Sequence, residues 1–208
     1  MSARVKAWAE SVASYERACR SLMELEAGAY DGLIIDPPWH FKTRSAKGEG
    51  KSAQAHYNVM KKEHIRALPI FRLASVDAVI MTWATAPLLD VGIECMKAWG
   101  FKFVSAGAWH KKSSTGKKTA FGTGFWLRSA AEFWLIGTTG RPKPGSRKVR
   151  NLIEAAVREH SRKPDDQYAV MEQLVPSTRR IELFARQARP GWDAWGDQVG
   201  LFKAPEAG

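Results

Sequence analysis

The feature that most constrains the fold is an alternation, along the whole chain, of short apolar runs with segments of helical spacing. Segment 31–36 (DGLIID) is a short apolar run that ends at a Pro-Pro pair, as a buried strand does. Segment 87–100 instead carries apolar residues at helical spacing, with Pro87 in its first turn and Gly100 as its C-terminal cap. We therefore expect an α/β domain of three layers, with helices on both faces of one sheet.

The remaining elements follow from the same patterns. Further strands are predicted at 76–83, 101–110, 130–138 and 179–186, helices at 62–69 and 164–175, and a short strand or turn at 191–198. The pattern leaves the state of 148–157 open. Segment 1–28 is expected to begin as an amphipathic surface helix rather than a signal peptide, because it carries acids. With 208 residues, the chain fits a single domain, 1–208.

The charge of the chain favours a polyanionic partner. Lys and Arg total 32 against 21 acids, which gives a net charge of +11 and attracts nucleic acid. The excess is clustered in KKSSTGKK (111–118) and RPKPGSRKVR (141–150). The Gly-rich, basic segments 40–58 and 111–126 each follow a predicted strand, so we expect them to be substrate loops.

Composition also excludes several classes. No apolar run approaches the roughly 18 residues of a membrane span, so no membrane contact is expected. The two cysteines, Cys19 and Cys95, form no disulfide framework, which indicates a reducing cytoplasm. Neither the cysteines nor the five histidines have metal-ligand spacing, and no metal is expected.

The sharpest motif is Asp36-Pro37-Pro38-Trp39, directly after the first predicted strand. Two prolines remove two backbone donors and stiffen the turn, so its carbonyl oxygens are expected to lack local donors. A planar amine such as adenine N6 donates two hydrogen bonds, one to Asp36 and one to the Pro37 carbonyl, which would aim its lone pair at an electrophilic methyl. Trp39 is expected to offer a stacking face for the base.

With this motif and several further blocks, the chain resembles the MT-A family of adenine-N6 methyltransferases, which includes the catalytic subunit of the eukaryotic mRNA adenosine methyltransferase and bacterial and phage members. The blocks are HYNVM (56–60), WATAPLLDVGIECMKAWGF (83–101), AWHKK (108–112), GTGFWLRSAAEFWLIGTTG (122–140), SRKPDDQYAVMEQLVPSTRRIELFAR (161–186) and GWDAWGDQ (191–198). The resemblance implies a Rossmann-like fold with a permuted order of motifs, because the catalytic motif precedes the cofactor-binding part. It also implies S-adenosylmethionine as cofactor and S-adenosylhomocysteine as product.

Carried over by position, the resemblance assigns the cofactor site. It implies that Lys163 pairs with the cofactor carboxylate, that Glu182 and Arg186 contact the cofactor, and that Asp197-Gln198 match an Asn-Gln pair beside it, together with Asp36. Gln198 would bond the adenine edge of the cofactor. The chain departs from the family at Gln187-Ala188-Arg189, where related members carry His-Asn, so the ribose contacts are expected to differ.

The resemblance also indicates the substrate side. Tyr57, Trp126, Arg128 and Glu132 match positions around the target base, and Lys111 and Lys112 are expected to contact nucleic acid. Residue types alone leave Trp126 equally compatible with a core position. Arg128, in a Gly-rich loop, suits a phosphate or base-edge contact.

The expected function is methylation of adenine N6 in DNA, on a base swung out of its stack, by a bacterial or phage-type enzyme. Three alternatives stay open: RNA adenosine methylation, a non-catalytic nucleic-acid-binding partner, and methylation of protein glutamine. Retention of Asp36 and Trp39 argues against the second, and the net charge of +11 argues against the third. A homodimer or a partner subunit is compatible with the sequence, which does not define a recognition sequence.

Overall fold

The computed structural model describes residues 3–39, 60–124, 126–159 and 161–203 of the chain. Its helices are α1 (Ala3–Glu24), α3 (Lys62–Arg66), α4 (Leu89–Ala98) and α5 (Asp166–Leu174), with 3-10 turns at Ile70–Arg72 and Ala86–Leu88. Its strands are β1 (Tyr30–Ile35), β2 (Ala74–Ala84), β3 (Lys102–Lys112), β4 (Ala131–Thr138), β5 (Leu152–Ala156), β6 (Arg180–Leu183) and β7 (Asp193–Trp195).

Every predicted helix and strand has a counterpart within a few residues, and the open segment 148–157 contains strand β5. Pro87 lies in the 3-10 turn before α4 rather than in α4, and Pro164 stands two residues before α5. The substrate loop predicted at 111–126 begins later, because β3 continues through Lys112. The loop predicted at 40–58 lies outside the described residues.

The seven strands form one mixed sheet in the order β5-β3-β4-β2-β1-β6-β7. Strand β4 runs antiparallel to its neighbours β2 and β3, while every other pairing is parallel. The carboxyl ends of six strands and the amino end of β4 therefore meet at one end of the sheet, which we call the carboxyl end. The opposite end holds the start of those six strands and the finish of β4.

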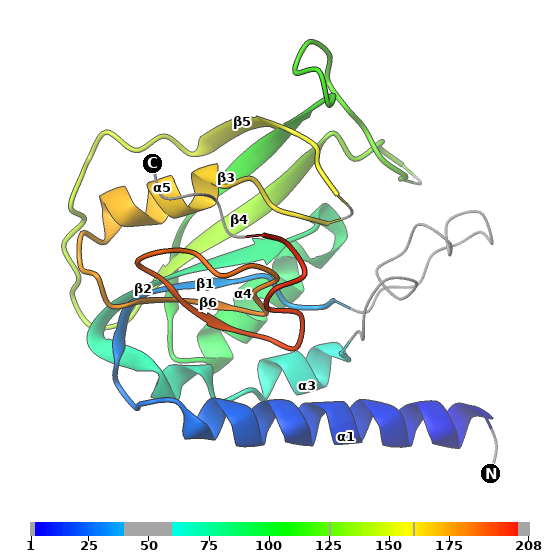
Figure 1. Ribbon diagram of the computed structural model, residues 1–208, viewed down its shortest axis with the longest axis vertical. Coiled ribbons are helices and arrows are strands. Elements are labelled where there is room, and N and C mark those ends of the chain that lie inside the picture. Colours follow the sequence, from blue (N-terminus) through cyan, green and yellow to red (C-terminus); the bar gives the residue numbers. More distant parts are fainter. Residues whose placement is uncertain (1–2, 40–59, 125, 160, 204–208) are drawn as a thin grey trace.

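Alternation along the strands divides the core into two clusters. Leu33 and Ile35 of β1 pack in one cluster with residues of α1, α3 and α4, whereas Ile34 between them packs in the other with Tyr168 and residues of α5. Successive side chains of a strand point to opposite faces of the sheet, so helices cover both faces. Figure 1 shows α1 and α3 along one side of the sheet and α5 along the other.

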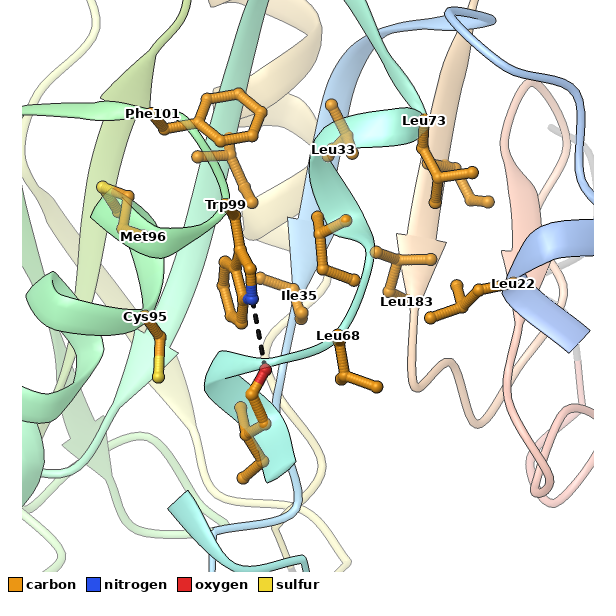
Figure 2. Close-up of a cluster of buried hydrophobic side chains, with 14 of the residues drawn as sticks. Leu22, Leu33, Ile35, Leu68, Leu73, Cys95, Met96, Trp99, Phe101 and Leu183 are labelled. Atoms are coloured by element: carbon orange, nitrogen blue, oxygen red, sulfur yellow. Dashed lines mark hydrogen bonds between the residues drawn. The ribbon is translucent and has the colours of Figure 1, made fainter. Parts of the chain in front are cut away.

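The larger cluster is built from helix and strand side chains that close around Trp99 (Figure 2). The Trp99 ring is 1% exposed, and its Nε1–H donates to the Ile65 carbonyl at 3.1 Å. The turn after α4 is completed by Gly100 at φ +80°, a conformation that glycine adopts without steric cost. This confirms Gly100 as the helix cap.

Helix α1 is tied to the domain at its C-terminal end. Arg72 Nη1 donates to the carbonyls of Leu25 at 2.6 Å and Leu22 at 3.3 Å, which lie at the helix end. Trp195 Nε1 donates to Ser21 Oγ at 2.9 Å. The Arg72 bonds tie the end of α1 to the 3-10 turn before β2, and the Trp195 bond ties α1 to the carboxyl end of β7.

Candidate functional site

The Asp36–Trp39 turn leaves β1 at the carboxyl end of the sheet, beside the neighbouring strand β6. Its carbonyls have local donors: the Trp39 N–H donates to the Pro37 oxygen at 2.8 Å and the Met60 N–H to the Pro38 oxygen at 2.9 Å. The prediction of carbonyls without local donors is therefore wrong, because the turn folds back on itself and pairs with the chain at Met60. A carbonyl oxygen has two lone pairs, so the Pro37 oxygen keeps capacity for a second donor.

Trp39 lies in the core. Its side chain is 5% exposed, and its Nε1–H donates to the Trp83 carbonyl at 3.0 Å. The prediction that Trp39 offers a stacking face is wrong for this structure, because the ring packs among core side chains instead of facing the site. The indole fixes the end of the turn to β2, which makes Trp39 a positioning residue for Asp36.

Asp36 begins a chain of alternating charges across three strands. Lys163 Nζ lies 2.8 Å from Asp36 Oδ2 and 3.3 Å from Glu132 Oε2, and Lys111 Nζ lies 2.6 Å from Glu132 Oε1. The side chains of Lys163, Glu132 and Lys111 are 9%, 17% and 15% exposed. We call Asp36, Lys163, Glu132 and Lys111 the ion-pair ladder. Lys111 and Glu132, predicted as substrate contacts, here bind each other.

The ladder determines the charge state of Glu132. Burial by itself would raise the pKa of this carboxyl, but the positive charge of Lys163, then that of Lys111, and hydrogen bonds from both outweigh it and lower the pKa to about 2. Glu132 is therefore ionised throughout the neutral range. It holds Lys163 at a fixed place between two carboxylates, and Lys163 in turn holds one oxygen of Asp36.

A pocket of about 470 Å³ opens beside Asp36 at the point where β1, β6 and β7 end. In sheets of this kind, ligands bind at the carboxyl ends of strands, where the connections leave in opposite directions. Here β1 connects to β2 on one side, while β6 pairs with β7 on the other. The lining residues are Ser14, Arg17, Ala18, Ser21, Asp36, Pro38, Met60, Ser161, Phe184, Arg186, Ala194, Trp195, Gly196, Asp197, Gln198 and Val199.

The pocket wall contains both of the non-glycine residues with positive φ in the described chain. Phe184 has φ 60° and Ser161 has φ 57°, a left-handed conformation that costs free energy for any residue with a Cβ. The Phe184 ring stacks edge-on against Trp195, with centroids 5.1 Å apart. Strained backbone of this kind concentrates at binding sites, where the surrounding structure enforces it.

The size and chemistry of this pocket fit S-adenosylmethionine, since pockets for ligands of that size run from about 300 to 1,000 Å³ and combine apolar walls with a few polar groups. Four of the predicted cofactor residues line it, namely Asp36, Arg186, Asp197 and Gln198. The other two do not. Lys163 binds Asp36, and Glu182, 8% exposed, bonds to Gln167 and Tyr168 of α5.

Glu182 is the centre of a buried polar network. Tyr168 OH donates to Glu182 Oε2 at 2.7 Å, and Gln167 Nε2 donates to Glu182 Oε1 at 3.4 Å. Burial raises the pKa of Glu182 to about 7, although the Tyr168 hydrogen bond acts in the opposite direction; the nearby Asp36 charge also raises it. Gln187, where the chain departs from the resembled pattern, joins this network through Tyr168 OH at 3.3 Å and is 6% exposed.

The sequence analysis missed the contribution of α1. Ser14, Arg17, Ala18 and Ser21 recur at helical spacing and line the pocket opposite the strand ends. The small and polar residues on one stripe of the helix indicated a polar face, but no local pattern shows which part of the domain that face covers. Only the packing of α1 on the domain shows it.

The loop between β3 and β4 carries the remaining predicted substrate residues. Its backbone forms a hairpin, with a bridge between Lys112 and Thr119. Lys112 binds Glu154 at 3.3 Å, Arg128 is exposed, and Trp126 is 90% exposed. Trp126 is thus a surface residue, not a core one. Tyr57 lies outside the described residues.

The described part of the chain lacks both a metal-binding cluster and a membrane-spanning helix. There, no three His, Cys, Asp or Glu side chains gather as a metal centre requires. No described helix combines the length and apolarity needed to cross a membrane.

Comparison with known proteins matches the MT-A70 family model to residues 30–198. The chain is 33% identical over 175 residues to an Arabidopsis thaliana N(6)-adenosine-methyltransferase MT-A70-like protein, covering 83% of the chain and 24% of that protein. It is 31% identical over 176 residues to the human N(6)-adenosine-methyltransferase catalytic subunit METTL3, covering 83% and 28%. It is 29% identical over 197 residues to the Mycoplasma type II methyltransferase M.MunI, covering 85% and 80%. The chain thus spans about a quarter of the length of the eukaryotic relatives.

Proposed function

Because the chain belongs to the MT-A70 family, we propose that it transfers a methyl group from S-adenosylmethionine to the N6 amine of adenine in DNA. The observation that carries this proposal is the position of Asp36, which both lines the pocket and ends the ion-pair ladder. One carboxylate therefore borders the cofactor pocket and is held by a buried lysine. An acceptor fixed in this way suits a donor amine beside an electrophile.

In the proposed reaction, the residues of the chain orient the amine. Asp36 accepts one N6 hydrogen and the free lone pair of the Pro37 oxygen accepts the other, so the nitrogen lone pair points away from both acceptors. Trp39 and Lys163 keep the turn and the carboxylate in place. The cofactor supplies an electrophilic methyl group when bound. The amine proton leaves after the transfer, with Asp36 as the nearest acceptor.

The proposed cofactor site uses the pocket residues Asp36, Arg186, Asp197 and Gln198. Gln198 suits the adenine edge, because an amide both donates and accepts hydrogen bonds. Asp197 suits an amino or hydroxyl donor rather than a carboxylate. Lys163 contacts Asp36, Glu132 and the Ser161 carbonyl, so it would bind the cofactor carboxylate only by giving up one of these three partners. Glu182 would act on the pocket indirectly, through its neighbours on β6.

The proposed fold is the family's Rossmann-like methyltransferase fold, with three layers and a permuted order of motifs. The parallel pairing of β1 with β6 supports it, because the catalytic turn and the cofactor strand are neighbours in space but lie at opposite ends of the sequence. The two core clusters on opposite faces of the sheet support the three layers.

DNA is the proposed polymer because the match to the type II methyltransferase extends over 80% of that protein. RNA is the second candidate, since the relatives named adenosine methyltransferases reach 31–33% identity. On either polymer, Trp126 and Arg128 are proposed to meet a base and a phosphate, because both lie exposed on the loop that borders the carboxyl end.

The test is transfer of labelled methyl to matched DNA and RNA oligonucleotides, followed by mass spectrometry of the nucleosides. We expect N6-methyladenine, with a rate at least about 100-fold lower in Asp36→Asn because a preorganised acceptor is lost. Asp90→Asn, at an exposed position on α4, is the matched control and should be unaffected. Methyl at another atom, or equal rates in wild type and Asp36→Asn, would contradict the proposal.

A further inference from the structure

Segment 139–151, which connects β4 to β5, starts at the end of the sheet opposite the proposed active site and ends beside Ala108, near the middle of β3. Strand β4 is antiparallel to its neighbours, so it finishes where the other strands begin. In Figure 1 this yellow-green segment runs along the left of the molecule, whereas the β3–β4 loop projects at the upper right. We call segment 139–151 the basic strap.

The basic strap has no regular secondary structure, yet it is fastened along its length. The Arg141 N–H donates to Asp77 Oδ1 at 2.6 Å, the Gly145 N–H donates to the Leu174 carbonyl at 2.9 Å, and the Asn151 carbonyl accepts from Ala108 at 2.9 Å. Between these bonds, Val149 packs against the core. The strap is therefore part of the folded domain, not a solvated tail.

Gly145 shows how closely the strap is held. A Cβ on Gly145 would come within 2.8 Å of Pro176 and 2.9 Å of the Gln173 carbonyl. A real Cβ is essentially never so close to a neighbouring heavy atom, so the strap backbone at Gly145 leaves no room for a side chain beside the C-terminal end of α5. The flanking charged side chains of Lys143 and Arg147 are exposed.

The strap presents only positive charge. It contains Arg141, Lys143, Arg147, Lys148 and Arg150, all exposed, and no acid. Among the described residues, none of these five forms an ion pair. Asp31 and Asp77 line one hollow with Arg141 and Lys143, but Asp77 accepts from the Arg141 backbone N–H and Asp31 from Ser177 Oγ, both at 2.6 Å.

We propose that the basic strap is a second binding surface for the phosphate backbone of the nucleic acid, away from the target base. The proposal rests on the substrate class proposed above. Five exposed cations spread along an extended segment match a row of phosphates better than a single anion, and each phosphate neutralised releases counterions. The strap would add affinity and leave the chemical step unchanged.

The length of the sheet sets how long the substrate must be. At about 3.3 Å per residue, the eight residues of β4 separate its two ends by about 25 Å. Since a duplex rises about 3.4 Å per base pair, at least about seven or eight base pairs beyond the target are needed to reach the start of the strap. A duplex that reaches both surfaces must follow the side of the domain.

The test measures binding without turnover, so it does not depend on methylation. The dissociation constants of a 40-base-pair and a 10-base-pair duplex, each with a central target adenine, are measured by fluorescence anisotropy at several salt concentrations. The variant is Arg141→Gln/Lys143→Gln/Arg147→Gln, which neutralises the cations in the first part of the strap. The charge-matched control is Arg20→Gln/Lys62→Gln/Lys97→Gln, which neutralises three exposed cations on α1, α3 and α4.

For the long duplex, the slope of log K against log salt should fall by about 0.9 for each phosphate that the variant no longer neutralises, and the control should keep the wild-type slope. For the short duplex, all three proteins should bind alike. Equal slopes for variant and wild type on the long duplex would overturn the proposal, as would an equal weakening of binding in variant and control. Failure of methylation with these binding results intact would overturn the proposed function and leave the strap standing.

Discussion

The two ends of the sheet use the same residue types in opposite ways. At the carboxyl end, Lys163 and Lys111 are largely buried and each lies within 3.3 Å of a carboxylate. In the basic strap, the cations are exposed and, among the described residues, form no ion pair with an acid. The ion-pair ladder holds charged side chains against each other, whereas the basic strap presents charged side chains to solvent.

This difference follows from the dielectric environment. A buried charge costs several kcal/mol unless a partner and further hydrogen bonds compensate it, so its position is tightly determined. An exposed charge needs no partner and acts over about 8–10 Å at physiological salt. The carboxyl end is thereby suited to orient one amine, whereas the strap is suited to attract a polymer.

The largest contrast is expected when one cation is removed from each end. Lys163→Met leaves Asp36 and Glu132 without their shared partner, which should cost about 3 kcal/mol of unfolding free energy. Arg147→Met should change it by less than about 0.5 kcal/mol, as exposed substitutions do. Urea unfolding measures both. Similar values for the two variants would show that the ladder is not energetically distinct from the strap.

A second contrast lies within the carboxyl end. The pKa of Glu182 is raised to about 7, so its contribution to stability is complete below the unfolded pKa near 4.5 and is lost as the pH rises through 7. Between pH 5 and pH 8, the free energy of unfolding of Glu182→Gln should therefore rise by about 3 kcal/mol relative to that of wild type. Thermal or urea unfolding at both pH values tests this. A constant difference would mean that Glu182 is ionised throughout.

Glu132 should behave in the opposite sense. Its pKa is lowered to about 2, so its contribution is present above the unfolded value near 4.5 and is lost as the pH falls toward 2. The difference in free energy of unfolding between wild type and Glu132→Gln should shrink by about 2 kcal/mol as the pH falls from 7 to 3. The same unfolding experiment measures it. An advantage independent of pH would place Glu132 outside the ladder.

The smallest effect concerns the pocket wall formed by α1. Arg17→Gln should weaken S-adenosylmethionine binding on the order of tenfold, the loss of one hydrogen bond to a charged group. Arg20→Gln, on the same helix but outside the pocket lining, is the control and should bind normally. Calorimetry without nucleic acid measures both. Equal affinities would remove α1 from the cofactor site.

Much of the fold could be predicted because the relevant patterns are local. Apolar runs such as 31–36 fix strands, and Gly100 marks the end of α4. The site was predictable in part. The motif located Asp36, and the resemblance pointed to Arg186 and Gln198, which line the same pocket. Trp39 was misjudged, since an aromatic side chain after a turn suits a core position and a surface position equally.

The amino-acid sequence by itself determined the strand and helix segments, the Asp36–Trp39 turn and the positive charge, because periodicity and proline are properties of neighbouring residues and net charge is a property of composition. Only the tertiary structure decided which charges pair and which do not. Asp36, Glu132 and Lys163 are far apart in the chain and meet through the sheet order. The direction of β4 likewise sends the start of the basic strap to the opposite end. Strand pairing joins distant segments, so no local pattern could place these side chains.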